Sequence, residues 1–329
     1  MKKRTLAAAM LCCAVLTGCA AEEPPAPAPT VTIEPAVAWP EDKLELNETG
    51  VPMLDVYVAD NQAAARMSVE SYLEGVLAGE MKNDWPMEAL KAQAILARTF
   101  VLKFVDEKES RYPGADISTD IEEAQAYDAA AVNDRIRQAV AETRGKVLAS
   151  DGELIFAWFH AHSGGTTERA VPGLGWDKEE PAYTAVVKGN EPEQADEPTL
   201  AQAAEWEADF SLDEFAAAAQ KQGKTVTLNT NSILKVGERG ESGRAVTLIC
   251  GDDTLNASSL RIALGSTKMR STLLTSFKLA DGKVHMAGKG YGHGVGMSQW
   301  GAYGMAQQGQ SAEQIATHYF ENVEIAKLW

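Results

Sequence analysis

The glycine-rich run at residues 288–302, which reads GKGYGHGVGMSQWGA, limits the fold of this chain more than any other stretch. Glycine occupies every second position from residue 288 to residue 296, and a Ser-Gln pair follows directly. Because glycine lacks a Cβ, it tolerates unusual backbone angles and lets another segment come close. A run so dense in glycine makes a poor ordinary strand. The sequence therefore predicts a tightly folded loop that carries His293, Ser298 and Gln299.

By itself, this loop does not define a function. Glycine-rich loops cradle phosphate, but the Lys-Ser/Thr ending of a P-loop is missing here. A dinucleotide fingerprint requires a βαβ context, which the sequence does not offer. Two interpretations stay open: a compact turn that closes a sheet, and a loop that presents polar groups to a ligand.

The N-terminus has the pattern of an export signal. Lys2, Lys3 and Arg4 precede an apolar stretch at residues 6–16, which is too short to span a bilayer as a mature helix. The sequence Leu-Thr-Gly that ends at residue 18 then leads into Cys19. We interpret residues 1–18 as a lipoprotein signal peptide and Cys19 as the lipidated first residue. The alternatives are an uncleaved signal anchor and cleavage at a nearby small residue.

Residues 19–50 begin with a proline-rich stretch that is typical of an extended tether. With a lipid on Cys19, we expect an exported protein anchored to the outer face of the cytoplasmic membrane. Residues 51–329 are long enough for one domain with a sizeable core, and we expect an inserted subdomain near residues 185–280. Only Cys250 remains besides the signal and lipid-site cysteines, so an internal disulfide is excluded.

The charge balance bears on the choice of partners. The chain carries 30 basic and 47 acidic residues, a net charge of −17. Without the three basic residues of the signal, the chain carries 27 basic residues and 47 acidic ones. Because phosphate contacts require basic patches, this balance argues against nucleic acid as a partner.

Secondary-structure signals are mixed along the body of the chain. Alternation predicts a strand at residues 54–58, and apolar spacing predicts a set of helices. The helices are expected at residues 69–79 with Gly79 as the stop, at residues 87–107 after Pro86, and at residues 127–143. Turn signals at residues 150–152 and 281–282 predict hairpins. Ser-x-x-Glu/Gln boxes at Ser211 and Ser311 predict two further helix starts.

Because helices and hairpins follow one another without regular alternation, the fold class we expect is α+β. We expect mixed helices and antiparallel hairpins around one catalytic cleft, not a doubly wound sheet.

Three motifs occur in order along the chain. The first covers residues 70–81 and 86–100 (ESYLEGVLAGEM and PMEALKAQAILARTF), the second residues 162–168 (HSGGTTE), and the third is the glycine-rich run. Together they resemble the stage II sporulation protein D family, which includes the amidase-enhancer proteins. The resemblance covers most of residues 54–328.

The resemblance implies a function. Sporulation members of the family are lytic transglycosylases that cut peptidoglycan glycan strands during engulfment and leave 1,6-anhydro ends. The expected substrate is the glycan strand, no cofactor is expected, and a sporulation setting implies a cell-wall amidase and a membrane scaffold protein as partners. The alternatives are a non-catalytic amidase enhancer or peptidoglycan-binding lipoprotein, and a hydrolase that uses water.

The resemblance assigns the family's catalytic glutamate to Glu80. Cleaving a glycosidic bond requires an acid that is still protonated near neutral pH. Apolar neighbours raise a carboxyl pKa, and the partial negative charge at a helix C-terminus acts in the same direction. The alternative is an ordinary solvated glutamate at a helix end.

Further residues are candidates for substrate binding. They are Gln93, Arg98, His162, Ser163, His293, Ser298 and Gln299. For Gln93 and Arg98, the alternative is a surface amide and an arginine paired with an acid. For His162 and Ser163, it is a satisfied polar turn, and His293, Ser298 and Gln299 either frame the cleft or brace the loop. Trp85, Trp158 and Trp300 either stack on sugars or belong to the core. Some family members bind zinc through paired His and Cys, but no cysteine lies near His160, so we expect no metal.

Overall fold

The computed structural model describes residues 37–193, 199–229 and 232–329. The predicted signal peptide at residues 1–18, the lipid site Cys19 and most of the tether therefore lie outside the described residues. No helix within the described ranges is long and apolar enough to cross a membrane.

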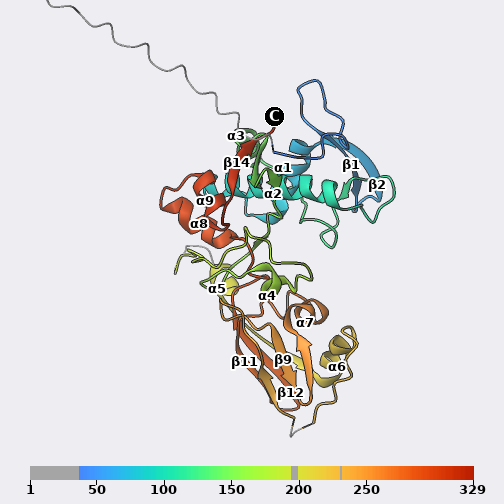
Figure 1. Cartoon of the computed structure of the whole chain (residues 1–329), viewed down its shortest axis with the longest axis vertical. Coiled ribbons are helices and arrows are strands. Elements are labelled where there is room, and N and C mark those ends of the chain that lie inside the picture. The colour runs from blue at the N-terminus through green and yellow to red at the C-terminus, as the bar shows by residue number, and fades with distance from the viewer. Residues whose placement is uncertain (1–36, 194–198, 230–231) are drawn as a thin grey trace, which may run out of the picture. The chain divides into compact units, whose positions relative to one another are not determined.

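The chain folds into helices and small sheets, which confirms the α+β prediction (Figure 1). The helices are α1 (Val69–Glu80), α2 (Met87–Glu107), α3 (Asp134–Glu142), α4 (Ala170–Leu174), α5 (Thr199–Ala204), α6 (Leu212–Gln220), α7 (Ala257–Leu264), α8 (Gln299–Gln307) and α9 (Ala312–His318). The strands are β1 (Met53–Val58), β2 (Ala63–Ser68), β3 (Ile117–Ser118), β4 (Lys146–Ser150), β5 (Glu153–Leu154), β6 (Phe159–His160), β7 (Glu205–Ser211), β8 (Leu234–Val236), β9 (Thr247–Cys250), β10 (Asp253–Asn256), β11 (Leu274–Ala280), β12 (Lys283–Lys289), β13 (Met297–Ser298) and β14 (Glu324–Lys327). Neighbouring strands pair antiparallel except β1 with β3 and β6 with β13, which are parallel.

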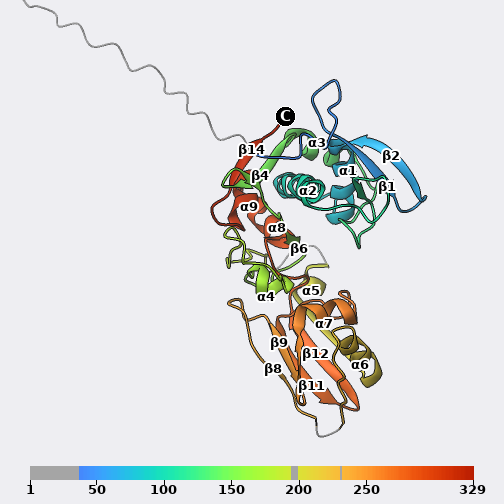
Figure 2. The same cartoon turned by 45° about the vertical axis from the view of Figure 1, so that its right-hand side comes forward.

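The first hydrophobic core is built around α2. This helix packs against α1, α3, α8 and α9, and Figure 2 shows it at the centre of that group. Small side chains at Ala89, Ala92, Ala94 and Ala97 are fully buried, which lets the neighbouring helices approach closely. The helix spans the predicted residues 87–107, because Pro86 fixes its start and helix-forming residues continue without interruption.

A second hydrophobic core lies between strands β7, β11 and β12 and the helices α6 and α7 (Figure 1). Its buried residues run from Trp206 to Met286. The hairpin at residues 281–282 and the capping box at Ser211 form as predicted. Both cores belong to one compact unit, Ala36–Trp329.

The compact unit begins earlier than residue 51. Leu44 is 5% exposed and belongs to the first core, and Ala38 forms a parallel bridge with Glu153 of β5. The later part of the predicted tether is therefore packed against the domain, because its apolar residues find partners there.

The predicted helix at residues 127–143 is shorter in the structure. Asn133 caps α3 by accepting a hydrogen bond from the Ile136 amide at 3.0 Å, so the helix begins at Asp134. The preceding residues form a loop that packs on α1. Helix α8, which the sequence reasoning missed, begins directly after the glycine-rich run, with Ser298 as its cap.

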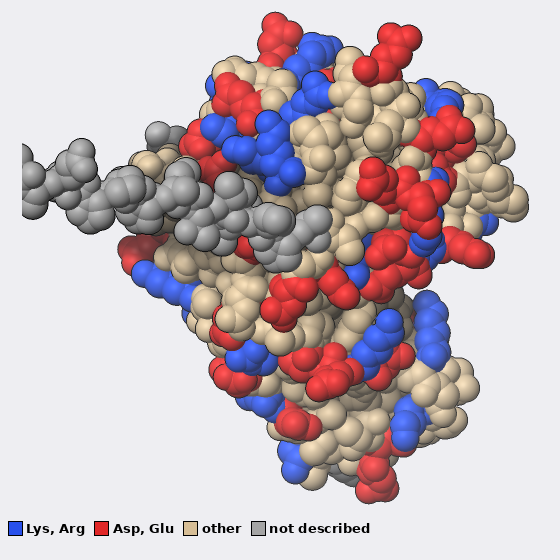
Figure 3. Space-filling view, turned by 45° about the horizontal axis from the view of Figure 1, so that its top comes forward, with Lys and Arg blue, Asp and Glu red and all other residues tan. Residues whose placement is uncertain are grey.

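Surface charges are mixed. On the described part of the face drawn in Figure 3, acidic and basic side chains are interspersed.

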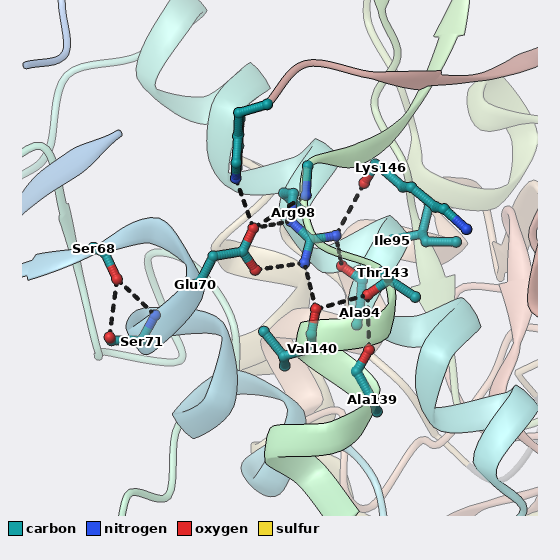
Figure 4. Close-up of polar contacts among 12 residues, drawn as sticks. Ser68, Glu70, Ser71, Ala94, Ile95, Arg98, Ala139, Val140, Thr143 and Lys146 are labelled. Carbon is teal, nitrogen blue, oxygen red and sulfur yellow. Dashed lines mark hydrogen bonds and ion pairs between the residues drawn. The ribbon is translucent and has the colours of Figure 1, made fainter. Parts of the chain in front are cut away.

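A buried ion pair joins α1 to α2. Arg98 is fully buried, and its Nε and Nη2 atoms donate to the two carboxylate oxygens of Glu70 at 3.1 and 2.6 Å (Figure 4). Its Nη1 atom also donates to the carbonyl of Lys146 at 3.0 Å, and the Trp329 indole donates to Glu70 at 2.9 Å. Such a bidentate pair fixes the relative position of two helices.

This arrangement corrects the expectation that Arg98 lines a cleft. Its donors are directed at Glu70 and at backbone carbonyls inside the protein, so they do not face a ligand. The alternative considered for this residue, an arginine paired with an acid, is the one the structure supports. The same contacts make Glu70 part of the interior rather than a solvated helix residue.

We predict that Arg98→Ala lowers the free energy of unfolding by about 3–5 kcal/mol, because it leaves a carboxylate without its partner in the interior. Arg137→Ala is the matched control, since that side chain is 54% exposed and pairs with Asp134 at the surface. The Arg137→Ala variant should lose less than about 1 kcal/mol of unfolding free energy. Denaturant unfolding followed by circular dichroism measures both, and equal losses would contradict the structural role of Arg98.

Candidate functional site

Glu80 is the last residue of α1 and forms part of the wall of an open pocket. The pocket has a volume of about 460 Å³ and is lined by residues 78–84. Helix α1 thus extends one residue beyond Gly79, the predicted stop. The side chain of Glu80 is partly buried where α1 ends.

Two glycines of α1 allow the loop before α3 to cover this carboxyl. A Cβ at Gly75 would lie 2.3 Å from the Tyr127 ring, and one at Gly79 would lie 2.7 Å from the Tyr127 backbone nitrogen. The close approach lets the Ala126 amide donate to Glu80 Oε1 at 2.7 Å. Glycine is therefore required at these positions for packing and not for ending the helix.

The Gln299 side chain approaches Glu80 from α8. Its Nε2 atom donates to the backbone carbonyl of Glu80 at 3.2 Å and to Gln93 Oε1 at 3.5 Å. Gln93 is fully buried, and its own Nε2 atom has no hydrogen-bond partner within the described residues. The structure thus brings Gln93 and Gln299, two of the predicted site residues, next to Glu80.

The environment of Glu80 changes its acidity. Burial removes water from the carboxyl and raises the pKa of Glu80 to about 7. Hydrogen bonds from the Ala126 amide and from the Gln299 side chain stabilise the charged form and act in the opposite direction. Because burial outweighs these bonds, a large fraction of Glu80 is protonated at neutral pH.

A second cluster of predicted residues gathers around Glu191, which the sequence reasoning missed. Oε1 of Glu191 accepts from the Ser163 amide at 2.6 Å and from the Ser298 hydroxyl at 2.7 Å. The Glu191 side chain is 6% exposed. Burial acts to raise the pKa of Glu191, whereas the hydrogen bonds from Ser163 and Ser298 lower it; the pKa is lowered overall, so this carboxylate is charged. No motif in the sequence singles out this glutamate.

The histidines of the site are neutral. His162 Nδ1 accepts from the Gly164 amide at 2.9 Å, and burial lowers the pKa of His162. His293 Nδ1 accepts from the Val295 amide at 3.0 Å, and burial together with nearby arginines lowers the pKa of His293 to about 3. Each side chain thus accepts a hydrogen bond from the backbone of its own loop through Nδ1.

The glycine-rich run forms the predicted tight loop. Gly292, Gly294 and Gly296 have φ angles of 112°, 85° and 69°, a region that favours glycine. A Cβ at Gly294 would lie 2.3 Å from the guanidinium of Arg244, and one at Gly296 would lie 2.0 Å from the Trp158 carbonyl oxygen. The run therefore fits between the strand segment around Trp158 and a buried arginine.

Of the three candidate tryptophans, two belong to the core and one is partly buried. Trp85 and Trp300 are 7% and 3% exposed, and their ring centroids lie 4.6 Å apart, so both belong to the core. Trp158 is partly buried and packs against Phe156 and Trp176 at 5.3 and 5.2 Å. Among the described residues, no group of three or more His, Cys, Asp or Glu side chains is arranged to hold a metal ion.

Comparison with known sequences identifies the class of protein. Residues 57–149 match the Stage II sporulation protein family, and residues 178–296 match a domain of unknown function (DUF8618). The chain is 31% identical over 312 residues to stage II sporulation protein D of Bacillus amyloliquefaciens, covering 87% of this chain and 81% of that protein. It is 28% identical to the protein of the same name from Bacillus subtilis, covering 90% of this chain and 84% of the relative.

An amidase enhancer of Bacillus subtilis is also similar, with 29% identity over 290 residues that cover 75% of this chain and 39% of the enhancer. Extended matches to relatives of similar length establish membership of a family. The chain belongs to the stage II sporulation protein D family.

The raised pKa of Glu80 predicts a pH dependence of stability. The folded-state pKa is about 7 and the ordinary value 4.5, so the protonated carboxyl favours the folded state fully below pH 4.5. This contribution is lost as the pH rises to about 7. Between these pH values, we expect the wild type to lose up to about 3 kcal/mol of unfolding free energy relative to Glu80→Gln, which cannot ionise.

Denaturant unfolding of both proteins at a series of pH values measures this difference. Glu193→Gln, which changes an exposed carboxyl, is the control and should follow the wild type. A constant difference between the wild type and Glu80→Gln from pH 4 to pH 8 would contradict the raised pKa.

Proposed function

We propose that this protein is a lytic transglycosylase of peptidoglycan with Glu80 as its acid. The observation that supports the proposal most is a carboxyl with a pKa of about 7 in the wall of an open pocket. An acid with a pKa near the working pH is best suited to general acid catalysis. The stage II sporulation protein D relatives support a role in the cell wall during sporulation.

The reaction needs one carboxyl and no water. Protonated Glu80 donates its proton to the oxygen that leaves C1 of N-acetylmuramic acid, and the bond between N-acetylmuramic acid and N-acetylglucosamine breaks. The C6 hydroxyl of the same muramic acid then bonds to C1, and its proton returns to the Glu80 carboxylate. The products are a 1,6-anhydro end and a free C4 hydroxyl, and the acid is regenerated.

The pocket geometry fits a polymer. Because the pocket is open and lies along residues 78–84, a glycan strand can pass it without an end entering a closed cavity. The Gln299 amide donates to the Glu80 backbone carbonyl and to Gln93 Oε1, while the pocket itself is lined by residues 78–84. The role of these two amides in the proposal is to orient the acid.

The N-terminal signal completes the proposal. A lipid on Cys19 holds the domain at the outer face of the cytoplasmic membrane, where peptidoglycan is accessible. A cell-wall amidase and a membrane scaffold protein are the proposed partners.

A second candidate function is enhancement of an amidase without glycan cleavage. It is favoured by the similarity to the amidase enhancer of Bacillus subtilis. Under this alternative, the protein accelerates a purified cell-wall amidase and leaves the glycan strands intact.

We predict that the purified protein releases 1,6-anhydro ends from glycan strands and that Glu80→Gln lowers the rate by about 10²- to 10⁴-fold. Mass spectrometry of strands with and without stem peptides measures the products. Glu74→Gln, on the same helix, is the control and should cleave at the wild-type rate. Reducing ends would indicate a hydrolase, and intact strands would favour the enhancer. Wild-type cleavage by Glu80→Gln would refute the assignment of the acid.

A further inference from the structure

We propose that Glu191 is a positioning residue, whose carboxylate fixes the Ser298 hydroxyl at the start of α8 and thereby holds the Gln299 amide against Glu80. This inference rests on the proposed function, because the position of the Gln299 amide matters for catalysis only if Glu80 is the acid. Its first experimental readout does not require catalysis.

The Glu191 carboxylate is buried and hydrogen-bonded to two separate segments of the chain. Oε1 accepts two hydrogen bonds, from the Ser163 amide at 2.6 Å and the Ser298 hydroxyl at 2.7 Å. Hydrogen bonds to a charged acceptor are roughly twice as strong as neutral ones. The Glu191 side chain is 6% exposed, so water does not replace these partners. The carboxylate therefore joins the loop of residue 163 to the start of α8.

Two hydrogen bonds, one donated and one accepted, fix the orientation of the Ser298 hydroxyl. Its single hydrogen is directed at Glu191, while its oxygen accepts from the Gly301 amide at 3.2 Å as the cap of α8. The backbone of Ser298 is also held, because it pairs with His160 between strands β13 and β6. The first residue of α8 after this anchored cap is Gln299.

The Gln299 side chain connects the start of α8 to Glu80 through a hydrogen bond. Its Nε2 atom lies 3.2 Å from the Glu80 carbonyl oxygen and 3.5 Å from Gln93 Oε1. Its hydrogen bonding also lowers the pKa of Glu80, against the effect of burial. If α8 shifts at its first residue, the Gln299 amide withdraws and Glu80 holds its proton more tightly.

The titratable groups near Glu191 are held in one charge state. His162 lies 3.8 Å from Glu191 but is neutral, since its Nδ1 atom accepts from the Gly164 amide. Tyr319, near Glu191, has its pKa raised well above the usual value by burial. The buried Arg244 guanidinium also interacts with Glu191, and burial lowers the pKa of Arg244 to about 10, so it stays charged at neutral pH.

Around Glu80, the titratable groups are Tyr72 on α1 and the pocket residues Lys82 and Asp84. Burial raises the pKa of Tyr72, which keeps its hydroxyl neutral. The Tyr72 hydroxyl donates to the Ser118 carbonyl at 2.7 Å, and replacing Glu191 leaves this contact in place.

The test is the pKa of Glu80 in Glu191→Gln, measured by ¹³C NMR of the side-chain carboxyl and assigned by comparison with Glu80→Gln. The substitution keeps size and one acceptor oxygen but removes the charge. We expect the pKa of Glu80 to rise by about 0.5 to 1, the effect of roughly one weakened hydrogen bond. Glu193→Gln removes an exposed charge two residues away and should leave the pKa unchanged.

Two further variants complete the test. Ser298→Ala removes the bridging hydroxyl and should give the same rise, which keeps the proposal testable if Glu191→Gln does not fold. In a Gln299→Ala background, Glu191→Gln should cause no further rise, because the transmitting amide is already absent. An unchanged Glu80 pKa in Glu191→Gln, or a full rise in the Gln299→Ala background, would overturn the proposal.

Kinetics give a separate readout. With glycan strands as substrate, we expect Glu191→Gln to lower kcat about tenfold with KM nearly unchanged, because the acid rather than the binding surface is displaced. A rise in KM alone would contradict a positioning role. If the wild type does not cleave glycan, the proposed function fails, and the carboxyl titration still decides whether Glu191 positions Gln299.

Discussion

The bidentate ion pair between Arg98 and Glu70 is the constraint on which the site depends. It fixes α1 against α2 near the start of α1, inside the first hydrophobic core. Because a helix rises 1.5 Å per residue, Glu80 lies about 15 Å further along the same rigid helix. The acid is therefore held by a framework whose anchor is distant from the pocket, and disturbance of the anchor is expected to move the acid.

At the C-terminal end of α1, close packing rather than an ion pair holds the helix against its neighbours. The absence of a Cβ at Gly75 and Gly79 lets the segment around Tyr127 cover the helix and bury the Glu80 carboxyl. Burial alone would favour the neutral acid strongly, and the Ala126 and Gln299 hydrogen bonds moderate this preference. The resulting pKa of about 7 lets the same group both give and accept a proton near neutral pH.

The sequence predicted the local features and missed the long-range ones. Helix α2 and the glycine-rich loop followed from proline, glycine and periodicity, which act over a few residues. Gly79 was wrongly expected to end α1, since its packing partner lies 48 residues further along the chain. Arg98 was expected at a cleft because its partner Glu70 could not be identified by spacing alone. Glu191 stayed hidden for the same reason, since a carboxylate anchor has no local signature.

The most direct test of the central claim is the pH dependence of kcat/KM for glycan cleavage by the wild-type protein. If protonated Glu80 supplies the proton, kcat/KM should fall above a single pKa of about 7, approaching a tenfold loss per pH unit. A profile that stays flat to pH 9, or that already falls with a pKa near 4.5, would contradict the account.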